Sequence, residues 1–135
     1  MKKIRVLFWV LGLMACEEKI DPTLQMSITR GKEIYSDFCV QCHLPDGKGV
    51  PNAFPPLALS DFIDTQLEAS IAGLKYGMQG AIVVNGETYN GNMPAQGLDD
   101  TEIADVMNYI RNSWGNQYRK LVTPSDVAQI SKSEP

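Results

Sequence analysis

Cys39-Val40-Gln41-Cys42-His43 carries the clearest chemical signal in the chain. Two cysteines three positions apart, followed directly by a histidine, are the pattern for covalent attachment of a c-type haem. Each cysteine adds to one of two neighbouring vinyl groups on the same porphyrin edge, and the next side chain then lies beneath the iron. Because His43 is the only histidine in the chain, any histidine that binds the iron must be His43.

Length and cysteine count limit the architecture. A chain of 135 residues has room for one small domain with a single core, which a haem would help to fill. Cys16 lies in a different context from Cys39 and Cys42 and makes the count odd. The sequence therefore does not predict a disulfide framework.

The first residues read as an export signal. Basic residues in Met1-Lys2-Lys3-Ile4-Arg5 precede nine apolar residues, 6–14, and then the small Ala15. A membrane span needs about 20 apolar residues, so this run is too short to be one. Leu13-Met14-Ala15-Cys16 resembles the lipobox of bacterial lipoproteins, which predicts cleavage after residue 15 and lipidation of Cys16. The alternative is an ordinary secretory signal with an incidental cysteine.

The charge of the processed chain excludes one class of partner. Cleavage would remove three basic residues and no acidic one, which leaves nine basic residues against 16 acidic ones and a net charge of −7. Nucleic-acid binding calls for clustered Lys and Arg, so we do not expect it. Acyl chains on Cys16 would hold the protein to a membrane without a spanning helix. We therefore expect an exported, lipid-anchored protein that faces the periplasm or the cell exterior.

Helical patterns lie on both sides of the motif. A helix is expected from Ser27 into Cys39, capped by Ser27 or Thr29, with Gly31 marking either close approach of another helix or a loose first turn. The capping-box pattern at residues 65–68 predicts a short helix that ends at Gly77. Residues 99–102 are expected to cap the strongest helix, which ends at Gly115 and buries one face: Ile103, Val106, Met107 and Ile110.

The segments between these helices are rich in turn formers. Asn85-Gly86 between two β-prone runs predicts one small hairpin. Residues 53–59 are apolar but contain two prolines, so they cannot form a central strand and are expected to cover a haem face or a small core. Met93-Pro94 lies in a second irregular loop. The predicted organisation is a signal peptide at 1–15, a flexible tether at 16–26, a folded domain at 27–118 and a mobile polar tail at 119–135, with at most a short helical turn near Val127.

Several short motifs along the chain resemble those of a known family and occur in the order that is typical of it. These motifs are Gly31, Tyr35, Cys39-Cys42-His43, Gly47, Gly49, Phe54-Pro55-Pro56-Leu57, Val84-Asn85-Gly86, Tyr89, Met93-Pro94 and Tyr109-Ile110-Arg111. Residues 27 to about 118 resemble a class I cytochrome c domain, most similar to the group related to subunit III of cbb3-type oxidases. Leu44-Pro45 departs from the glycine that usually follows the histidine. The resemblance implies an all-α cytochrome c fold, with three to four helices around one haem and one small β-hairpin.

The resemblance also implies the roles of individual residues. Cys39 and Cys42 would bind one haem c covalently, and His43 and Met93 would be the axial ligands of the iron. The Pro55 carbonyl would accept a hydrogen bond from His43, Leu57 would pack on the porphyrin, and Gly31 and Tyr109 would mark the crossing of the first and last helices.

Other methionines could in principle supply the second ligand in place of Met93. Met93 is the one that lies in an irregular loop, from which its sulfur could turn inward. Met107 fits better as a core residue, and Met26 lies in the expected tether. Met78, between Gly77 and Gly80, is the main rival.

Ligand number determines what such an iron can do. Four porphyrin nitrogens, one imidazole and one thioether leave no open position, so we expect electron transfer and no catalysis. Thioether ligation and a dry pocket raise the reduction potential. The alternatives are a Cys-x-x-Cys thiol oxidoreductase, a structural zinc site and a peroxidase-like haem; the first lacks a βαβ pattern, the second lacks a fourth ligand, and the third needs Met93 displaced.

The redox partners are not legible from sequence. Lys32, Lys48 and Lys75 could surround an exposed haem edge, yet the acidic total equally favours a basic partner. The domain could shuttle on its tether or serve as the fixed haem c subunit of a larger reductase, oxidase or dehydrogenase. No small-molecule substrate is expected.

Overall fold

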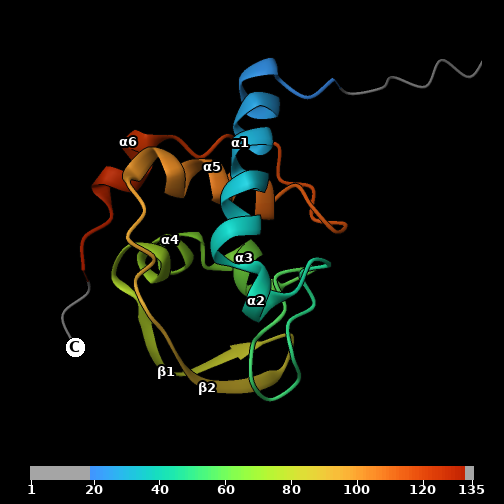
Figure 1. Ribbon diagram of the computed structural model, residues 1–135, viewed down its shortest axis with the longest axis vertical. Coiled ribbons are helices and arrows are strands. Elements are labelled where there is room, and N and C mark those ends of the chain that lie inside the picture. The colour runs from blue at the N-terminus through green and yellow to red at the C-terminus, as the bar shows by residue number, and fades with distance from the viewer. Residues whose placement is uncertain (1–18, 133–135) are drawn as a thin grey trace, which may run out of the picture.

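The computed structural model describes residues 19–132. The predicted signal peptide and Cys16 lie outside this range. Helices α1, α5 and α6 form the upper part of the molecule in Figure 1, the β1–β2 hairpin forms its lower end, and α3 and α4 lie between them. Within the described residues, no helix combines the length and apolar character needed to cross a membrane.

Helix α1 (Pro22–Phe38) begins earlier than predicted. The Asp21 carboxylate accepts hydrogen bonds from the backbone N–H groups of Thr23 (2.8 Å) and Leu24 (3.3 Å). Pro22 occupies the first turn, where its missing N–H has no helical partner to lose. The prediction of a cap at Ser27 or Thr29 and of a tether reaching residue 26 was therefore wrong, because Asp21-Pro22 is a helix start.

A one-turn helix, α2 (Val40–His43), follows directly after Cys39. Helices α3 (Asp61–Thr65) and α4 (Leu67–Tyr76) replace the single helix expected from the residue 65–68 pattern. Thr65 ends α3, and its hydroxyl donates to the Asp61 carbonyl (2.8 Å) instead of capping α4. The predicted stop at Gly77 is confirmed, with a φ of +82°.

The predicted hairpin is present and longer than expected. Strands β1 (Met78–Val84) and β2 (Glu87–Met93) are antiparallel, and Met78 is the partner of Met93. Asn85 and Gly86 have φ values of 52° and 82°, the positive values that a type I′ turn requires. Met93 ends a strand and does not lie in an irregular loop, which corrects the sequence prediction. Long-range strand pairing, invisible in the local residue types, orders both ends of the hairpin.

Helix α5 (Asp100–Ile110) has the predicted capping box, made by Asp99 and Glu102. Its expected inner face is buried: Ile103, Val106, Met107 and Ile110 expose 3% or less of their surface. The helix ends at Ile110, five residues before Gly115. The chain then turns. The buried Asn116 side-chain amide donates hydrogen bonds to the carbonyls of Leu57 and Ile110.

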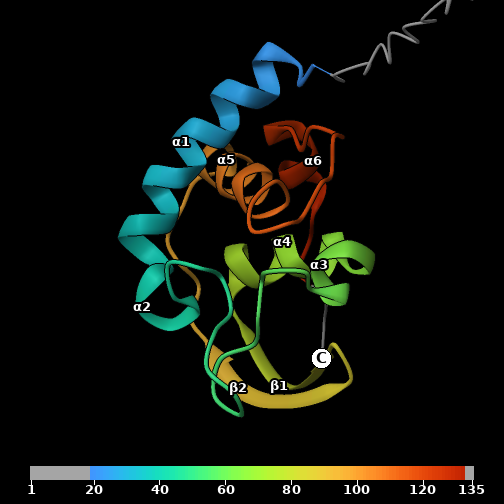
Figure 2. The ribbon, with the colours of Figure 1, turned by 90° about the vertical axis from the view of Figure 1, so that its right-hand side faces the viewer.

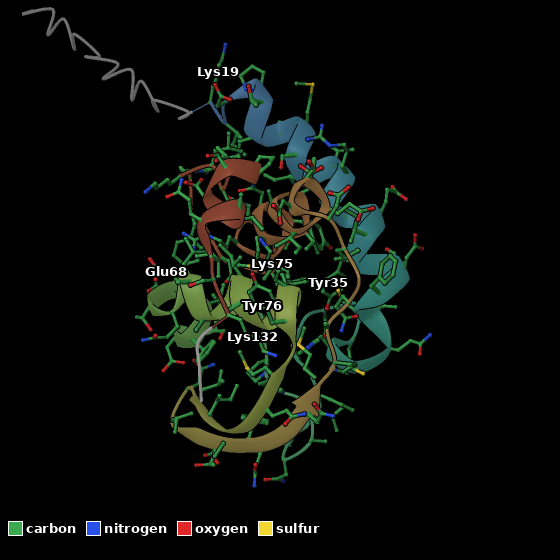
Figure 3. The ribbon with its side chains drawn as sticks, turned by 90° about the vertical axis from the view of Figure 1, so that its left-hand side faces the viewer. Lys19, Tyr35, Glu68, Lys75, Tyr76 and Lys132 are labelled. Atoms are coloured by element: carbon green, nitrogen blue, oxygen red, sulfur yellow. The ribbon has the colours of Figure 1, made fainter. Side chains whose placement is uncertain are left out.

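The C-terminal segment packs against the domain, so the prediction of a mobile tail at 119–135 was wrong for the part that the structure describes, whereas the short helical turn expected near Val127 is present. Helix α6 (Pro124–Gln129) is capped by Thr123, and Val122 and Val127 are buried. The Lys75 ammonium donates to the Val127 carbonyl (3.0 Å), and the Tyr76 hydroxyl donates to the Ile130 carbonyl (2.9 Å). Figure 3 shows Lys75 and Tyr76 on α4 close to this final segment.

The crossing of α1 and α5 forms the centre of the helical part. A Cβ atom on Gly31 would lie 2.0 Å from the Asp105 carbonyl oxygen and 2.9 Å from the Cβ of Tyr109. This confirms that Gly31 and Tyr109 mark the crossing. The Asp105 carboxylate accepts hydrogen bonds from Ser27 and Arg30 of α1, which links the two helices by polar contacts as well.

Residues 19–132 contain six helices and a two-stranded sheet. The mostly helical class with one hairpin is confirmed, whereas the expected number of helices, three to four, was too low. The additional helices are short, and α6 falls in the region predicted to be a tail.

Candidate functional site

Cys39, Cys42 and His43 come together because the chain makes one further helical turn after α1. The backbone N–H of His43 donates to the Cys39 carbonyl (2.9 Å), which closes that turn. Residues three and four positions apart share a helix face, so the two thiols and the imidazole project to one side. Cys39 is buried and Cys42 is exposed.

The imidazole of His43 is oriented by a backbone carbonyl. Its Nδ1 atom lies 3.0 Å from the Pro55 oxygen, the contact that the resemblance implied. Because a carbonyl only accepts, this contact places the ring proton on Nδ1 and leaves the Nε2 lone pair free. Burial lowers the pKa of His43, although the bond to Pro55 acts in the opposite direction. The side chain is therefore suited to be a neutral nitrogen ligand.

Two glycines allow the Pro55 carbonyl to reach His43. A Cβ atom on Gly49, whose φ is +63°, would lie 2.2 Å from the Phe54 carbonyl oxygen. The carbonyl of Gly47 accepts hydrogen bonds from the N–H groups of Leu57 (2.7 Å) and Ala58 (2.9 Å). The loop after α2 is thus folded back onto the helix, and the proline-rich segment is held against the imidazole.

Two adjoining cavities lie between α2 and the hairpin, on the side of the molecule where Figure 2 shows the loops that follow α2. Their volumes are about 80 Å³ and about 310 Å³. Six residues line both cavities, which makes them two parts of one slot: Cys39, His43, Pro55, Met78, Ile82 and Met93. We call this space the haem slot. Its inner part is lined mostly by apolar side chains of the core, including Ile63, Leu74 and Ile110.

The slot brings together most residues singled out in the sequence. Cys39, His43, Pro55, Leu57 and Met93 line its inner part, and Cys42 lines its outer part. Sequence reasoning missed Ile82 and Phe62, which also line the slot. Ile82 was assigned only to a ribbon, and the face that it presents follows from the strand register.

The comparison with known proteins agrees with this geometry. The sequence model of the cytochrome c family matches residues 28–114. The chain belongs to the cytochrome c family.

Some relatives match this chain over most of their own length, and others match it over only a part of their length. A cytochrome c-552 of Thermus thermophilus is 37% identical over 98% of this chain and 86% of its own length. The cytochrome c subunit of a quinone alcohol dehydrogenase from Gluconobacter oxydans is 36% identical over 74% of this chain, but only 21% of its own length is matched. The cbb3-type oxidase subunit FixP of Bradyrhizobium diazoefficiens is 30% identical over 79% of this chain and 37% of its own length.

As a cytochrome c, the chain carries covalently bound haem c and is an electron carrier. The residues of the slot fit a haem. Two thiols lie beside the oriented neutral imidazole, and the side chains of Met78 and Met93 supply two thioethers in the same slot, whose inner part is lined mostly by apolar residues. When bound, haem c supplies a one-electron iron couple, whose potential the protein adjusts through ligand identity and burial. The chain's own residues attach it, orient it and exclude water.

An aromatic cluster supports the attachment region from behind. The rings of Tyr35, Tyr109 and Trp114 lie with centroids 5.0 to 5.4 Å apart, in tilted and edge-on arrangements that aromatic pairs favour. The Tyr35 hydroxyl donates to the Leu44 carbonyl (2.7 Å), and the Trp114 indole donates to the Pro45 carbonyl (3.0 Å). The two residues after His43 are thereby tied to α1 and to the end of α5.

The three lysines considered for the haem edge are not among the residues that line the slot. Lys75 forms an ion pair with Asp100 (2.9 Å), and Lys48 pairs with Asp46 (3.1 Å). Neither these lysines nor Lys32 line the slot, and the described residues of its outer part include no Lys, Arg, Asp or Glu. A lysine ring around the exposed haem edge stays a prediction.

Proposed function

We propose that this cytochrome c binds one haem through thioether bonds from Cys39 and Cys42, with His43 and Met93 as the two axial ligands of the iron. The observation that carries the proposal is the oriented imidazole, with Nδ1 3.0 Å from the Pro55 oxygen, in a slot that Met93 also lines. Leu57 packs on the porphyrin. With both axial positions filled, the protein accepts and donates single electrons and binds no small-molecule substrate.

Attachment and ligation are tested separately. Purified protein, expressed with the haem maturation machinery, should retain haem under denaturing conditions and give a c-type pyridine haemochrome spectrum. The Cys39→Ala and Cys42→Ala variants should each change that spectrum, because one vinyl group is left unsaturated. A wild-type protein that loses its haem on denaturation would contradict covalent attachment.

The distal ligand is tested with two matched variants. The ferric wild type should show the weak charge-transfer band of methionine-to-iron ligation, and its ferrous form should show one strongly upfield-shifted methionine methyl signal in NMR spectra. Both signals should be lost in Met93→Leu and kept in Met78→Leu. The reverse pattern would assign the ligand to Met78, and a five-coordinate wild type would reject the His/Met assignment.

We further propose that cleavage after residue 15 leaves Cys16 lipid-modified, so that the domain is anchored outside the cytoplasm. The apolar run and the lipobox-like residues support this proposal. The test is fractionation: the wild type should sediment with membranes, and Cys16→Ser should move to the soluble fraction with its haem retained. Mass spectrometry of the mature N-terminus would identify the acyl groups.

A second candidate role is that of a haem c subunit in a larger oxidoreductase complex. It is favoured because relatives that match most of this chain are named as cytochrome subunits of alcohol and gluconate dehydrogenases. Gentle solubilisation of native membranes followed by size separation decides between the roles. Haem migrating with a large complex supports a subunit, and haem migrating at the mass of the lone lipoprotein supports a shuttle.

A further inference from the structure

Two methionines face each other at the open end of the hairpin. Met78 begins β1, Met93 ends β2, and the two residues are direct partners in the antiparallel register. Side chains of directly opposed residues lie on the same face of the sheet, with Cβ atoms about 4.5 to 5.5 Å apart. Any face that Met93 presents to the slot is therefore presented by Met78 as well.

The two side chains also share their surroundings. Both line the inner and the outer part of the slot, together with His43. The other methionines of residues 19–132 are placed differently: Met26 is 57% exposed on α1, and Met107 is a core residue, 1% exposed on α5. Met107 lines only the inner part of the slot, and a rigid helix holds it.

Helix α4 leaves space for the Met78 side chain. A Cβ atom on Gly73 would lie 2.9 Å from the terminal methyl carbon of Met78 and 4.0 Å from its sulfur. Glycine inside a helix lowers its stability by up to about 1 kcal/mol relative to alanine, so the space that Gly73 leaves for Met78 has an energetic cost. Methionine is unbranched and has three rotatable side-chain bonds, which lets its sulfur move without a change in the backbone. Met78 thus packs on Gly73 beside the slot, and rotation about its side-chain bonds can turn its sulfur away from α4.

We propose that Met78 is a reserve thioether donor on the distal face of the haem slot, which ligates the iron when the Met93 sulfur is removed. The inference rests on the proposed function, because it requires haem in the slot and Met93 as the usual ligand. Two flexible thioethers at opposed positions give the distal side two sulfur donors. Replacement of Met93 by a residue that has no sulfur and leaves the distal position open therefore leaves the iron six-coordinate, with Met78 as the new ligand.

The test compares Met93→Ala with the double variant Met93→Ala/Met78→Leu. Alanine vacates the distal position, whereas the leucine in Met93→Leu fills it, so the alanine variant gives Met78 access and the leucine variant does not. The single variant should keep a thioether charge-transfer band, shifted from the wild-type wavelength, and an upfield methionine methyl signal. The double variant should lose both and bind added imidazole more tightly. Met93→Thr, which keeps strand propensity, is a second background for the same comparison.

The outcomes separate the two proposals. If single and double variants have identical spectra in both backgrounds, the reserve role of Met78 is overturned and the ligation by Met93 stands. If Met78→Leu alone abolishes the wild-type band, the assignment of Met93 fails and Met78 is the primary ligand. A wild type without a thioether signal rejects the proposed function itself.

Discussion

At the scale of single residues, Leu44 is the position where the chain departs from its family in a way that has a physical consequence. Its φ of 63° and ψ of 161° lie in a region that is essentially restricted to glycine. The resemblance expected glycine after the histidine, and the backbone explains that preference. Tyr35 holds the strained residue in place by donating its hydroxyl to the Leu44 carbonyl.

Leu44→Gly should therefore stabilise the protein. Backbone strain of this kind costs about 1–3 kcal/mol, while the added freedom of glycine in the unfolded chain costs about 0.5–1 kcal/mol. We expect the free energy of unfolding to rise by about 1 kcal/mol, measured by guanidinium denaturation of the haem-loaded protein.

Ala53→Gly serves as the control, because Ala53 is exposed and has no positive φ. It should lower the free energy of unfolding by about 0.4–1 kcal/mol. Equal losses in the two variants would show that Leu44 is not strained.

Burial of a single residue also makes the Cys39 thiol unreactive in the folded chain. Burial, with a smaller contribution from Cys42, raises the pKa of the Cys39 thiol to about 11. A thiol with this pKa is almost entirely protonated at neutral pH, and the thiolate is the reactive form. In the folded chain Cys39 is therefore a poor thiol for redox exchange, which weighs against the thiol oxidoreductase alternative.

At the scale of elements, the crossing of α1 and α5 determines where the haem motif lies. Helix α1 ends directly before Cys39, so the position of the helix fixes the position of the thiols. Backbone contact at Gly31, together with the Asp105 carboxylate that accepts from Arg30, leaves little freedom at the crossing. The aromatic cluster of Tyr35, Tyr109 and Trp114 continues this contact toward the motif.

Gly31→Ala tests that contact. The added methyl carbon would lie 2.0 Å from a backbone oxygen, which cannot move aside as a flexible side chain could. Overpacking of this kind costs about 1–3 kcal/mol and outweighs the better helix propensity of alanine. We expect a fall of that size in the free energy of unfolding, together with a lower yield of haem-loaded protein.

Lys32→Ala is the matched control, because Lys32 is exposed and lies next to Gly31 on the same helix. That variant should stay within about 0.5 kcal/mol of the wild type. An equal effect of both substitutions would contradict a special role for the crossing.

At the scale of the whole molecule, the haem slot lies in the same core that holds the helices together. Core residues from α3, α4 and α5 line its inner part, including Ile63, Leu74, Met107 and Ile110. An apolar space left unfilled removes packing contacts from every residue around it. The bound group should therefore contribute to folding as well as to electron transfer.

Removal of the attachment sites tests this dependence. A Cys39→Ala/Cys42→Ala variant, purified and shown by absorbance to be free of haem, should have less helix and a broader thermal transition at lower temperature. Far-UV circular dichroism against temperature measures both. A haem-free variant that melts cooperatively at the wild-type temperature would show that the polypeptide core is sufficient without the group.

Much of the site was legible in the sequence because it depends on neighbours along the chain. The spacing of Cys39, Cys42 and His43 fits one helical turn, and Asn85-Gly86 and the Asp99 capping box are equally local. The predictions of a tether and of a tail were wrong for two different reasons. Asp21-Pro22 is a local helix start that was read as a linker, whereas the burial of Val122 and Val127 depends on distant partners in α4 and α5.

The sequence by itself determined the chemistry: which cysteines can attach a haem, which histidine can bind its iron, and that the chain is helical with one hairpin. Only the tertiary structure decided that the paired strands extend as far as Met78 and Met93, and that the described residues lining the slot include no Lys, Arg, Asp or Glu. Covalent spacing and turn chemistry act over a few residues and can be read directly. Strand length and burial depend on contacts between residues far apart in the chain, which no local pattern specifies.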